Sequence, residues 1–342
     1  MNLRVATFGE SHIGLVISSL FLTLILQSCS VDETFHNTDP NPNTVPKTLG
    51  DVIEWRITKD PTPDRVAINV SDEWQSLTPQ STDYAIWIGH ATYLLNTGDV
   101  TVLTDPIFSK RASPVGWAGP ERLIPPALSI AQLPSIDAVI ISHNHYDHLD
   151  LPSLKTLQAI TPNMLILVPQ GDKALLDSQG LVNVSQFRWW QTTKVNQTEF
   201  TFTPVQHWSG RWVTGRNTSL WGGWFLKSPN LSLYHAGDTG YSKDFITTQE
   251  RMGTPDFAFI PIGAYKPRWF MKNQHVDPAE AVQIALDLQV KRSFGMHWGT
   301  FILTDESVNE PRLMLAKALR ERGLLPDFFI APTPGAIINL DP

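Results

Sequence analysis

The sequence predicts an α/β fold in which β-sheets are covered by helices within one layered domain. Two observations favour this fold class. Short apolar runs typical of buried strands begin near residue 84 and at first follow one another directly. From residue 137 onwards, such runs alternate with segments of helical pattern. The chain has 342 residues, 42% of them hydrophobic, which is enough to build one large core or two ordinary ones.

The first predicted strands come before the first predicted helix. Residues 84–89 and 93–95 are mostly apolar and flank a Gly-His pair, and we expect them to form one strand. Residues 100–104 are expected to form the next strand. The two should pair with each other, because the turn-forming segment 96–99 lies between them.

The rest of the domain is predicted to alternate strands with helices. Apolar runs predict strands at residues 137–142, 164–168, 199–205, 220–226, 231–235, 257–261 and 292–296, the fourth and fifth of them paired. Helical patterns predict helices at residues 151–159, 278–288 and 311–321. Asp150 is the expected N-cap of the first of these helices, with Pro152 in its first turn.

The first residues resemble an export signal. Residues 13–26 form a continuous run of apolar or small side chains, which is too short for a comfortable membrane span and fits the apolar region of a signal peptide. The segment Leu26-Gln27-Ser28-Cys29 resembles the lipobox of bacterial lipoproteins. This resemblance implies that Cys29 is lipidated and becomes the first mature residue. The alternative is an ordinary cleaved signal peptide or a short membrane anchor.

We therefore divide the chain into three parts. Residues 1–28 are predicted to be a signal peptide of lipoprotein type, residues 29–48 a tether rich in Pro, Asn and Thr, and residues 49–342 the folded domain. A lipidated Cys29 would hold the protein at a membrane surface of the bacterial cell envelope, in the periplasm or at the outer membrane. Cys29 is the only cysteine, so no intrachain disulfide can form.

The most informative feature is a cluster of potential metal ligands directly after the strand at 137–142. It has the spacing H-x-H-x-D-H and contains His143, His145, Asp147 and His148. Three later predicted strands also end near a His or Asp, at His207, Asp238 and His297. Because layered α/β folds bind ligands at the carboxyl ends of their strands, we expect these side chains to meet. A lone buried histidine is more often a hydrogen-bonded core residue, and His36 and His235 are interpreted in that way.

The residue types favour two metal ions. Neutral imidazole suits zinc, so His143, His145 and His207 would hold one ion. The second ion would be held by Asp147, His148 and His297, with Asp238 shared between the two. Two divalent ions outweigh two carboxylates, so the site would attract an anion such as a phosphodiester and could activate water beside it.

The motif and its later partners resemble those of a known superfamily. The H-x-H-x-D-H motif with a later His, Asp and His is similar to the metallo-β-lactamase superfamily, whose fold is an αβ/βα sandwich of two mixed sheets flanked by helices. The similarity extends to the family of N-acylphosphatidylethanolamine-hydrolysing phospholipases D over roughly residues 45–329. It rests on the metal motif and on the segments 89–92, 103–109, 111–114, 206–208, 237–241, 261–272, 274–278 and 297–301.

The resemblance implies a function for the domain at 49–342. It would be a dinuclear zinc phosphodiesterase that hydrolyses N-acylphosphatidylethanolamine-type phospholipids to N-acylethanolamine and phosphatidic acid. The implied ligands of two zinc ions per chain are His143, His145, Asp147, His148, His207, Asp238 and His297. Asp147, Tyr146 and His275 would also be catalytic, and Tyr146, Gln274 and His275 would bind substrate.

The individual roles leave alternatives open. His275 would donate a proton to the leaving group or orient a metal ligand. Tyr146 would hydrogen-bond a phosphoryl oxygen or simply pack. Asp105 and His90 are better explained as supports of the metal ligands than as ligands themselves.

Two loops combine basic and apolar side chains, which suits an anionic lipid surface. The residues are Lys110, Arg111, Lys266, Arg268, Trp269, Phe270, Met271 and Lys272. The alternative is a solvated loop with a packed aromatic residue. A homodimer is also expected as a possible assembly.

Other functions fit the sequence less well. The formal net charge of −7 and the absence of a basic stretch argue against a nucleic-acid partner. A thiolate-ligated lactamase site is excluded, because the only cysteine is Cys29. Two alternatives remain: a metal-dependent hydrolase of another small phosphodiester or a lactone, and a tethered scaffold with an inactive metal site.

Overall fold

The computed structural model describes residues 34–38, 49–58, 65–78, 80–211 and 215–341. The predicted signal peptide lies outside the described residues. Residues from Phe35 onwards form one structural unit, which contains both sheets and the helices around them. Among the described residues, no helix has both the length and the apolar character needed to cross a membrane.

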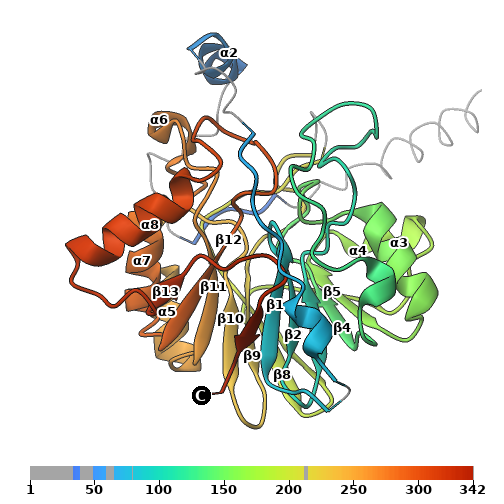
Figure 1. The fold of residues 1–342 in the computed structure, drawn as a ribbon. Helices are drawn as coiled ribbons and strands as arrows, with labels where there is room; N and C mark the ends of the chain where they lie inside the picture. Colours follow the sequence, from blue (N-terminus) through green and yellow to red (C-terminus); the bar gives the residue numbers. More distant parts are fainter. Residues whose placement is uncertain (1–33, 39–48, 59–64, 79, 212–214, 342) are drawn as a thin grey trace, which may run out of the picture. The chain divides into compact units, whose positions relative to one another are not determined.

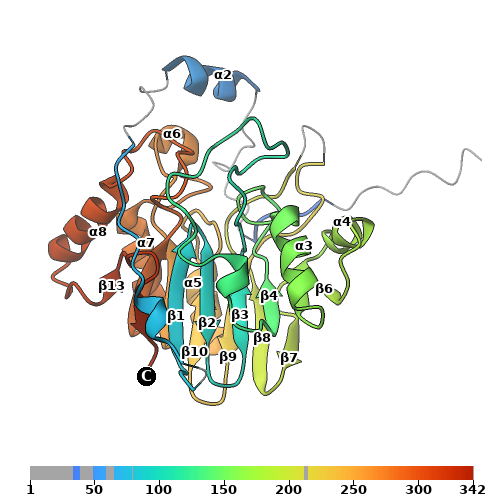
Figure 2. The same ribbon diagram turned by 45° about the vertical axis from the view of Figure 1, so that its right-hand side comes forward.

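Two seven-stranded sheets form the centre of the unit (Figures 1 and 2). The first sheet has the order β14-β1-β2-β3-β4-β5-β6. Its strands are β1 (Tyr84–Gly89), β2 (Thr92–Asn96), β3 (Thr101–Thr104), β4 (Ala138–Ile140), β5 (Leu165–Pro169), β6 (Val184–Phe187) and β14 (Ile337–Asn339). Pairs from β14 to β3 are antiparallel, whereas β3 to β6 are parallel.

The second sheet has the order β13-β12-β11-β10-β9-β8-β7 and the same division. Its strands are β7 (Thr192–Val195), β8 (Thr198–Thr203), β9 (Gly223–Lys227), β10 (Ser232–His235), β11 (Phe257–Pro261), β12 (Arg292–Met296) and β13 (Phe329–Ile330). Pairs from β7 to β10 are antiparallel, and β10 to β13 are parallel. Each sheet is therefore mixed.

Helices cover the outer faces of the sheets (Figure 2). On the side of the first sheet lie α3 (Leu151–Ile160) and α4 (Lys173–Ser178), and on the side of the second lie α5 (Asp244–Met252), α7 (Pro278–Asp287) and α8 (Glu310–Glu321). The remaining elements are the helices α2 (Leu49–Thr58) and α6 (Arg268–Met271) and the 3₁₀ turns η1 (Glu73–Ser76) and η2 (Ile130–Gln132). The predicted layered fold of two mixed sheets flanked by helices is confirmed.

Strand β1 shows why the central strands are apolar throughout. Ala85 and Trp87 pack into the core between the sheets, whereas Ile86 and Ile88 pack into the cluster under the helices. Side chains alternate between the two faces of a strand, and in β1 both faces are covered. The sequence pattern is therefore a continuous apolar run.

One element prediction is wrong. Residues 84–95 form two antiparallel strands, β1 and β2, with Trp87 opposite Tyr93, and not one strand. Gly89 and His90 have φ values of 137° and 55°, which reverse the chain within a tight turn. The predicted pairing across residues 96–99 joins β2 to β3, and the predicted pairing of β9 with β10 is confirmed.

The helix α3 begins where it was predicted, but its capping differs from the expectation. Asp150 occupies the N-cap position without a side-chain hydrogen bond to the helix backbone. Its carboxylate instead accepts hydrogen bonds from Ser109 and from the hydroxyl of Ser153. Asp150 thus fastens the loop before α3 to the segment that follows β3.

Candidate metal centre

The predicted metal ligands gather at one edge of the sandwich, where strands of both sheets end. The first sheet contributes the loop after β4, and the second contributes the segments after β8, β10 and β12. All seven predicted ligands belong to groups whose donor atoms are close enough to hold a metal ion: His143, His145, Asp147, His148, His207, Asp238 and His297.

One group consists of the imidazoles of His143, His145 and His207. The His145 Nδ1 atom lies 2.8 Å from His143 Nε2 and 3.4 Å from His207 Nε2. Burial lowers the pKa of His145 to about 3 and the pKa of His143 and of His207 well below the ordinary value. The three rings are therefore neutral near pH 7, and their nitrogens suit a cation such as zinc.

The second group joins Asp147 to His148 and His297. The Asp147 Oδ2 atom lies 3.4 Å from His297 Nε2 and 3.6 Å from His148 Nε2. Burial alone would lower the pKa of both imidazoles. Asp238 and Asp147 nevertheless raise the pKa of His297 to about 9 and that of His148 well above its ordinary value. The carboxylates favour positive charge at this point, which a divalent ion would supply in place of protons.

Asp238 lies between the two groups. Its Oδ2 atom is 3.1 Å from His297 Nε2 and 3.2 Å from His148 Nε2. The same oxygen is 3.9 Å from the Nε2 atoms of His143 and His207. Burial alone would raise the pKa of Asp238, but the surrounding imidazoles hold it well below the ordinary value. An ionised carboxylate in this position could be a ligand of a metal ion in either group.

Unpaired buried atoms show that the donor set fits a metal. Within the described part of the chain, several polar atoms of the site are buried and accept or donate no hydrogen bond: His145 Nε2, His148 Nε2, His275 Nδ1, His297 Nε2 and Asp238 Oδ1. Leaving one such atom unpaired costs about 1–3 kcal/mol. Coordination of divalent ions by the His148, His297 and Asp238 atoms would remove that cost there.

Asp105 holds residues of the site in place through hydrogen bonds. Its carboxylate accepts hydrogen bonds from the backbone N–H and hydroxyl of Ser142, each at 2.7 Å. It also contacts His148 Nδ1 at 2.9 Å and His235 Nε2 at 3.0 Å. Holding Nδ1 of His148 leaves its Nε2 directed at the site. His235 is fully buried, as expected for a core histidine, whereas the same interpretation is wrong for His36, which is exposed.

His90, in the turn between β1 and β2, orients Asp147. Its Nε2 atom lies 2.9 Å from Asp147 Oδ2, and its ring centroid is 4.0 Å from that of His297. Burial lowers the pKa of His90 to about 3, so the ring is neutral and can donate its Nε2–H to the carboxylate. His90 also lies close enough to be grouped with Asp147, His148 and His297 as a potential ligand.

Gln274 and His275 lie next to His207. The His207 Nδ1–H donates to the backbone carbonyl of Gln274 at 2.9 Å, which leaves Nε2 for a metal. The Gln274 side chain accepts a hydrogen bond from Trp208. His275 Nδ1 lies 3.8 Å from Asp238 Oδ2, and burial lowers the pKa of His275 to about 4. His275 is therefore neutral near pH 7.

Tyr146 is adjacent in sequence to the ligands His145 and Asp147, but its side chain contacts Arg211 and lines a cavity. The Arg211 guanidinium lies 4.0 Å from the centre of its ring. Both residues line a cavity of about 580 Å³ together with Pro114, Leu151 and Gln179. The structure thus places Tyr146 in a space large enough for part of a substrate.

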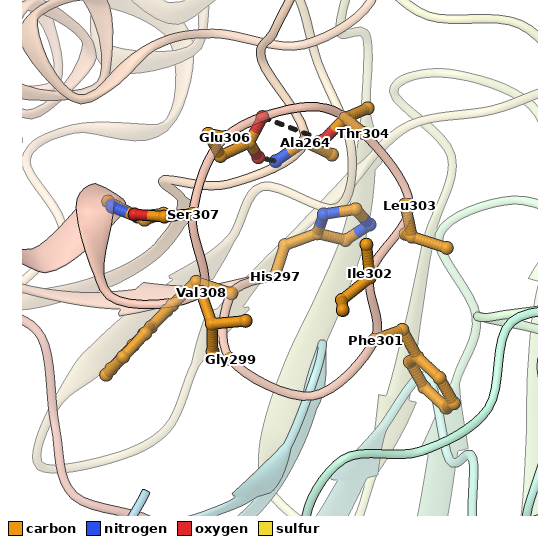
Figure 3. A pocket seen from close by; sticks show the side chains of 12 residues that line it. Ala264, His297, Gly299, Phe301, Ile302, Leu303, Thr304, Glu306, Ser307 and Val308 are labelled. Carbon is orange, nitrogen blue, oxygen red and sulfur yellow. Dashed lines mark hydrogen bonds between the residues drawn. The ribbon is translucent and has the colours of Figure 1, made fainter. Parts of the chain in front are cut away.

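A small pocket of about 20 Å³ lies beside His297, in the loop after β12 (Figure 3). The Glu306 carboxylate accepts hydrogen bonds from the backbone N–H groups of Ala264, Tyr265 and Lys266 and from the Thr304 hydroxyl. These bonds tie the loop after β11 to the loop that carries His297. No local sequence pattern predicts these hydrogen bonds of Glu306.

Sequence reasoning also missed the contacts of Asn144, inside the H-x-H-x-D-H motif. Its amide donates to Asp172 at 2.9 Å and accepts from the Gly210 N–H at 2.8 Å. Burial raises the pKa of Asp172 to about 7. Arg211 donates to the backbone carbonyls of Asn144 and Leu149. These bonds fix the loop that presents the ligands.

Comparison with known proteins agrees with this geometry. A family model described as a β-lactamase superfamily domain matches residues 100–298. A solved structure described as a possible metal-dependent hydrolase from Veillonella parvula shares the fold, with a TM-score of 0.63 and 19% identity over 76% of this chain and all of that one. The chain belongs to the metallo-β-lactamase superfamily and is a metal-dependent hydrolase of that superfamily.

Within the superfamily, the chain resembles N-acyl-phosphatidylethanolamine-hydrolyzing phospholipases D. One from Caenorhabditis elegans is 37% identical over 255 residues, which cover 71% of this chain and 72% of the worm protein. A mitochondrial one from Saccharomyces cerevisiae is 37% identical over 259 residues, which cover 74% of this chain. The chain spans only 55% of the yeast protein.

Proposed function

We propose that the protein is a dinuclear zinc phosphodiesterase of phospholipase D type. It hydrolyses N-acylphosphatidylethanolamine-type phospholipids to N-acylethanolamine and phosphatidic acid. The observation that carries the proposal is the shared position of Asp238 between a three-imidazole group and a group containing Asp147. The 37% identity to the worm phospholipase D supports the choice of substrate.

Each of the two ligand groups described above is proposed to hold one metal ion. His143, His145 and His207 would hold one zinc ion, Asp147, His148 and His297 would hold the other, and Asp238 would be shared by the two. Two zinc ions would activate water and stabilise charge on phosphoryl oxygens. Because two divalent ions outweigh the charges of Asp147 and Asp238, the buried site prefers a monoanionic diester.

Other residues act on the substrate in this proposal. Hydrolysis balances because water supplies both the oxygen that joins phosphorus and the proton that the leaving oxygen of N-acylethanolamine takes up. His275 is neutral near pH 7 and would hydrogen-bond the leaving oxygen through its remaining N–H without giving up that proton. Tyr146 contacts the lipid next to the phosphate from its cavity, and Gln274 shapes the site through Trp208.

The function can be tested with purified, zinc-loaded protein and a panel of phospholipids in ¹⁸O-labelled water. We expect phosphatidic acid and N-acylethanolamine from N-acylphosphatidylethanolamine, with the label in phosphatidic acid because water attacks phosphorus. Chelator-treated protein is the control. Turnover of a soluble diester or a lactone, but of no phospholipid, would establish the alternative hydrolase. A protein that holds both ions but turns over none of these substrates would support the inactive scaffold.

We also propose that the enzyme works at a membrane of the cell envelope. Cys29, the proposed lipidation site, precedes Phe35, the first residue of the folded unit, by six residues. Six extended residues span roughly 20 Å, so a lipid on Cys29 would keep the domain close to the bilayer. The homodimer also remains a proposal.

The contacts of the two basic loops reduce the number of residues that can face a lipid surface. Lys110 and Arg111 pair with Glu121, Arg268 pairs with Glu280, and Lys266 pairs with Glu310. Phe270 is buried and stacks on Trp55 at 5.1 Å. Trp269 and Lys272 are exposed. We therefore propose that Trp269 and Lys272 face the lipid.

Replacing Trp269 by serine should reduce turnover on anionic vesicles about fivefold, because an interfacial aromatic ring is lost. Turnover of a soluble diester should be unchanged. Leu325→Ser, which also removes an exposed apolar side chain, is the matched control. Equal loss on vesicles and on the soluble diester would contradict lipid docking by Trp269.

A further inference from the structure

The short segment Phe35–Thr38, which falls within the predicted tether, packs against the domain. Phe35 is 9% exposed and belongs to the hydrophobic core. Its N–H donates to the Asn217 carbonyl at 2.8 Å, and the Arg188 guanidinium lies 5.7 Å from its ring centre. At the other end, the Thr38 hydroxyl donates to Asp244 at the start of α5. We call Phe35–Thr38 the N-terminal strap.

Inside the strap, Asn37 contacts a metal ligand through the backbone. Its Oδ1 atom accepts a hydrogen bond from the His207 N–H at 3.1 Å, and its Nδ2 atom donates to the His207 carbonyl at 3.1 Å. Oδ1 also accepts from the Trp221 indole N–H at 2.9 Å. One amide side chain thus pairs both backbone groups of His207, as a neighbouring β-strand would.

The strand β8 ends at Thr203, and the isolated bridge between Gln206 and Gly240 stops one residue before His207, so Asn37 pairs the backbone groups of the ligand itself. Its ring is fixed separately by the bond from Nδ1 to the Gln274 carbonyl. Asn37 and Gln274 therefore hold His207 at two points, one on the backbone and one on the ring. Moving the backbone would move Nε2 away from His143 and His145.

We infer that the N-terminal strap is part of the metal centre and that Asn37 is a positioning residue for His207. The strap links the first residues of the folded unit to the site of the three imidazoles. The inference rests on the metal binding proposed above and does not depend on the substrate.

Replacing Asn37 by alanine should weaken the binding of one zinc ion about tenfold, the lower end of the usual effect of losing a residue that orients a ligand. The other ion should bind as before. Titration of metal-stripped, full-length protein against a chromophoric zinc chelator measures both affinities. Asn339→Ala is the matched control, since the side chain of this exposed asparagine bonds to Asp341 at the far edge strand.

Two further measurements keep a structural role apart from a positioning role. Asn37→Asp retains the two accepted hydrogen bonds but turns a carboxylate oxygen towards the His207 carbonyl oxygen, so its zinc affinity should also fall. Thermal unfolding of the metal-stripped variants reports stability without metal. Unchanged zinc affinity in Asn37→Ala, or the same loss in Asn339→Ala, would overturn the inference. Failure of the unaltered protein to bind zinc would instead refute the proposed function.

Discussion

Replacing Asp238 by alanine should lower kcat by about a thousandfold or more, on the order of 4 kcal/mol in activation free energy. The effect is large because one oxygen of Asp238 lies between 3.1 and 3.9 Å from the Nε2 atoms of four imidazoles. Without this carboxylate, the two ligand groups share no atom, and the positive charge that a divalent ion would bring to His148 and His297 loses a neighbouring carboxylate. Turnover and metal content should be measured on the same preparation.

The matched control is Asp177→Ala. Asp177 is an exposed carboxylate paired with Lys173 one helical turn away, so its removal should leave turnover and metal content unchanged. The prediction for Asp238 fails if Asp238→Ala still holds two ions per chain and keeps more than about a tenth of the activity. In that case the two groups would work independently, and the shared-carboxylate arrangement would not explain the reaction.

Replacing Asp105 by asparagine should destabilise the metal-stripped protein by about 3–5 kcal/mol at pH 7, the usual cost of breaking a buried ion pair. Asp105 is fully buried and accepts four hydrogen bonds, two from Ser142 and one each from His148 and His235. An amide of the same size presents an N–H group to some of these donors and carries no charge for His148. Urea unfolding of both proteins gives the difference.

The destabilisation should depend on pH in a defined direction. Burial alone would raise the pKa of Asp105, but His148 and His235 hold it below its ordinary value of 3.8. A carboxyl whose pKa is lower in the folded state stabilises the fold above the unfolded pKa and loses that contribution as the pH falls. The gap between the unaltered protein and Asp105→Asn should therefore be full at pH 6–7 and shrink below about pH 4.

Asp177→Asn is the control for this second experiment, because it removes an exposed carboxylate without changing a buried network. A gap of less than about 1 kcal/mol at pH 7 would show that the network around Asp105 tolerates an amide. A gap that stayed constant on acidification would show that the charge of Asp105 is not what stabilises the fold. In the zinc-loaded enzyme, Asp105→Asn should also weaken metal binding, since His148 loses its partner at Nδ1.

The sequence alone predicted the residues of the site because they follow local patterns. The apolar run at 137–142 predicts a buried strand, and a buried strand that leads into His143 to His148 has few explanations other than a metal. The same pattern at three other strand ends pointed to His207, Asp238 and His297. Periodicity and ligand type are properties of neighbouring residues, so they can be read without the fold.

Some elements escaped prediction because their local signals are weak. The edge strands β6, β7, β13 and β14 are short and in part exposed, so they lack the apolar run of a central strand. The turn at His90 was missed because apolar residues continue on both sides of it. The positive φ of His90 is imposed by the surrounding structure, because histidine has no strong local preference for this conformation.

The sequence by itself determined the layered α/β class and which side chains are the candidate metal ligands. Only the tertiary structure decided which of them share Asp238, which carboxylate stands behind His148, and which residue holds His207. Asp105 and His235 lie 130 positions apart in the chain, and Asn37 and His207 lie 170 apart. Contacts over such separations depend on the order of strands in two packed sheets. That order follows from the packing of the whole core, which no local pattern encodes.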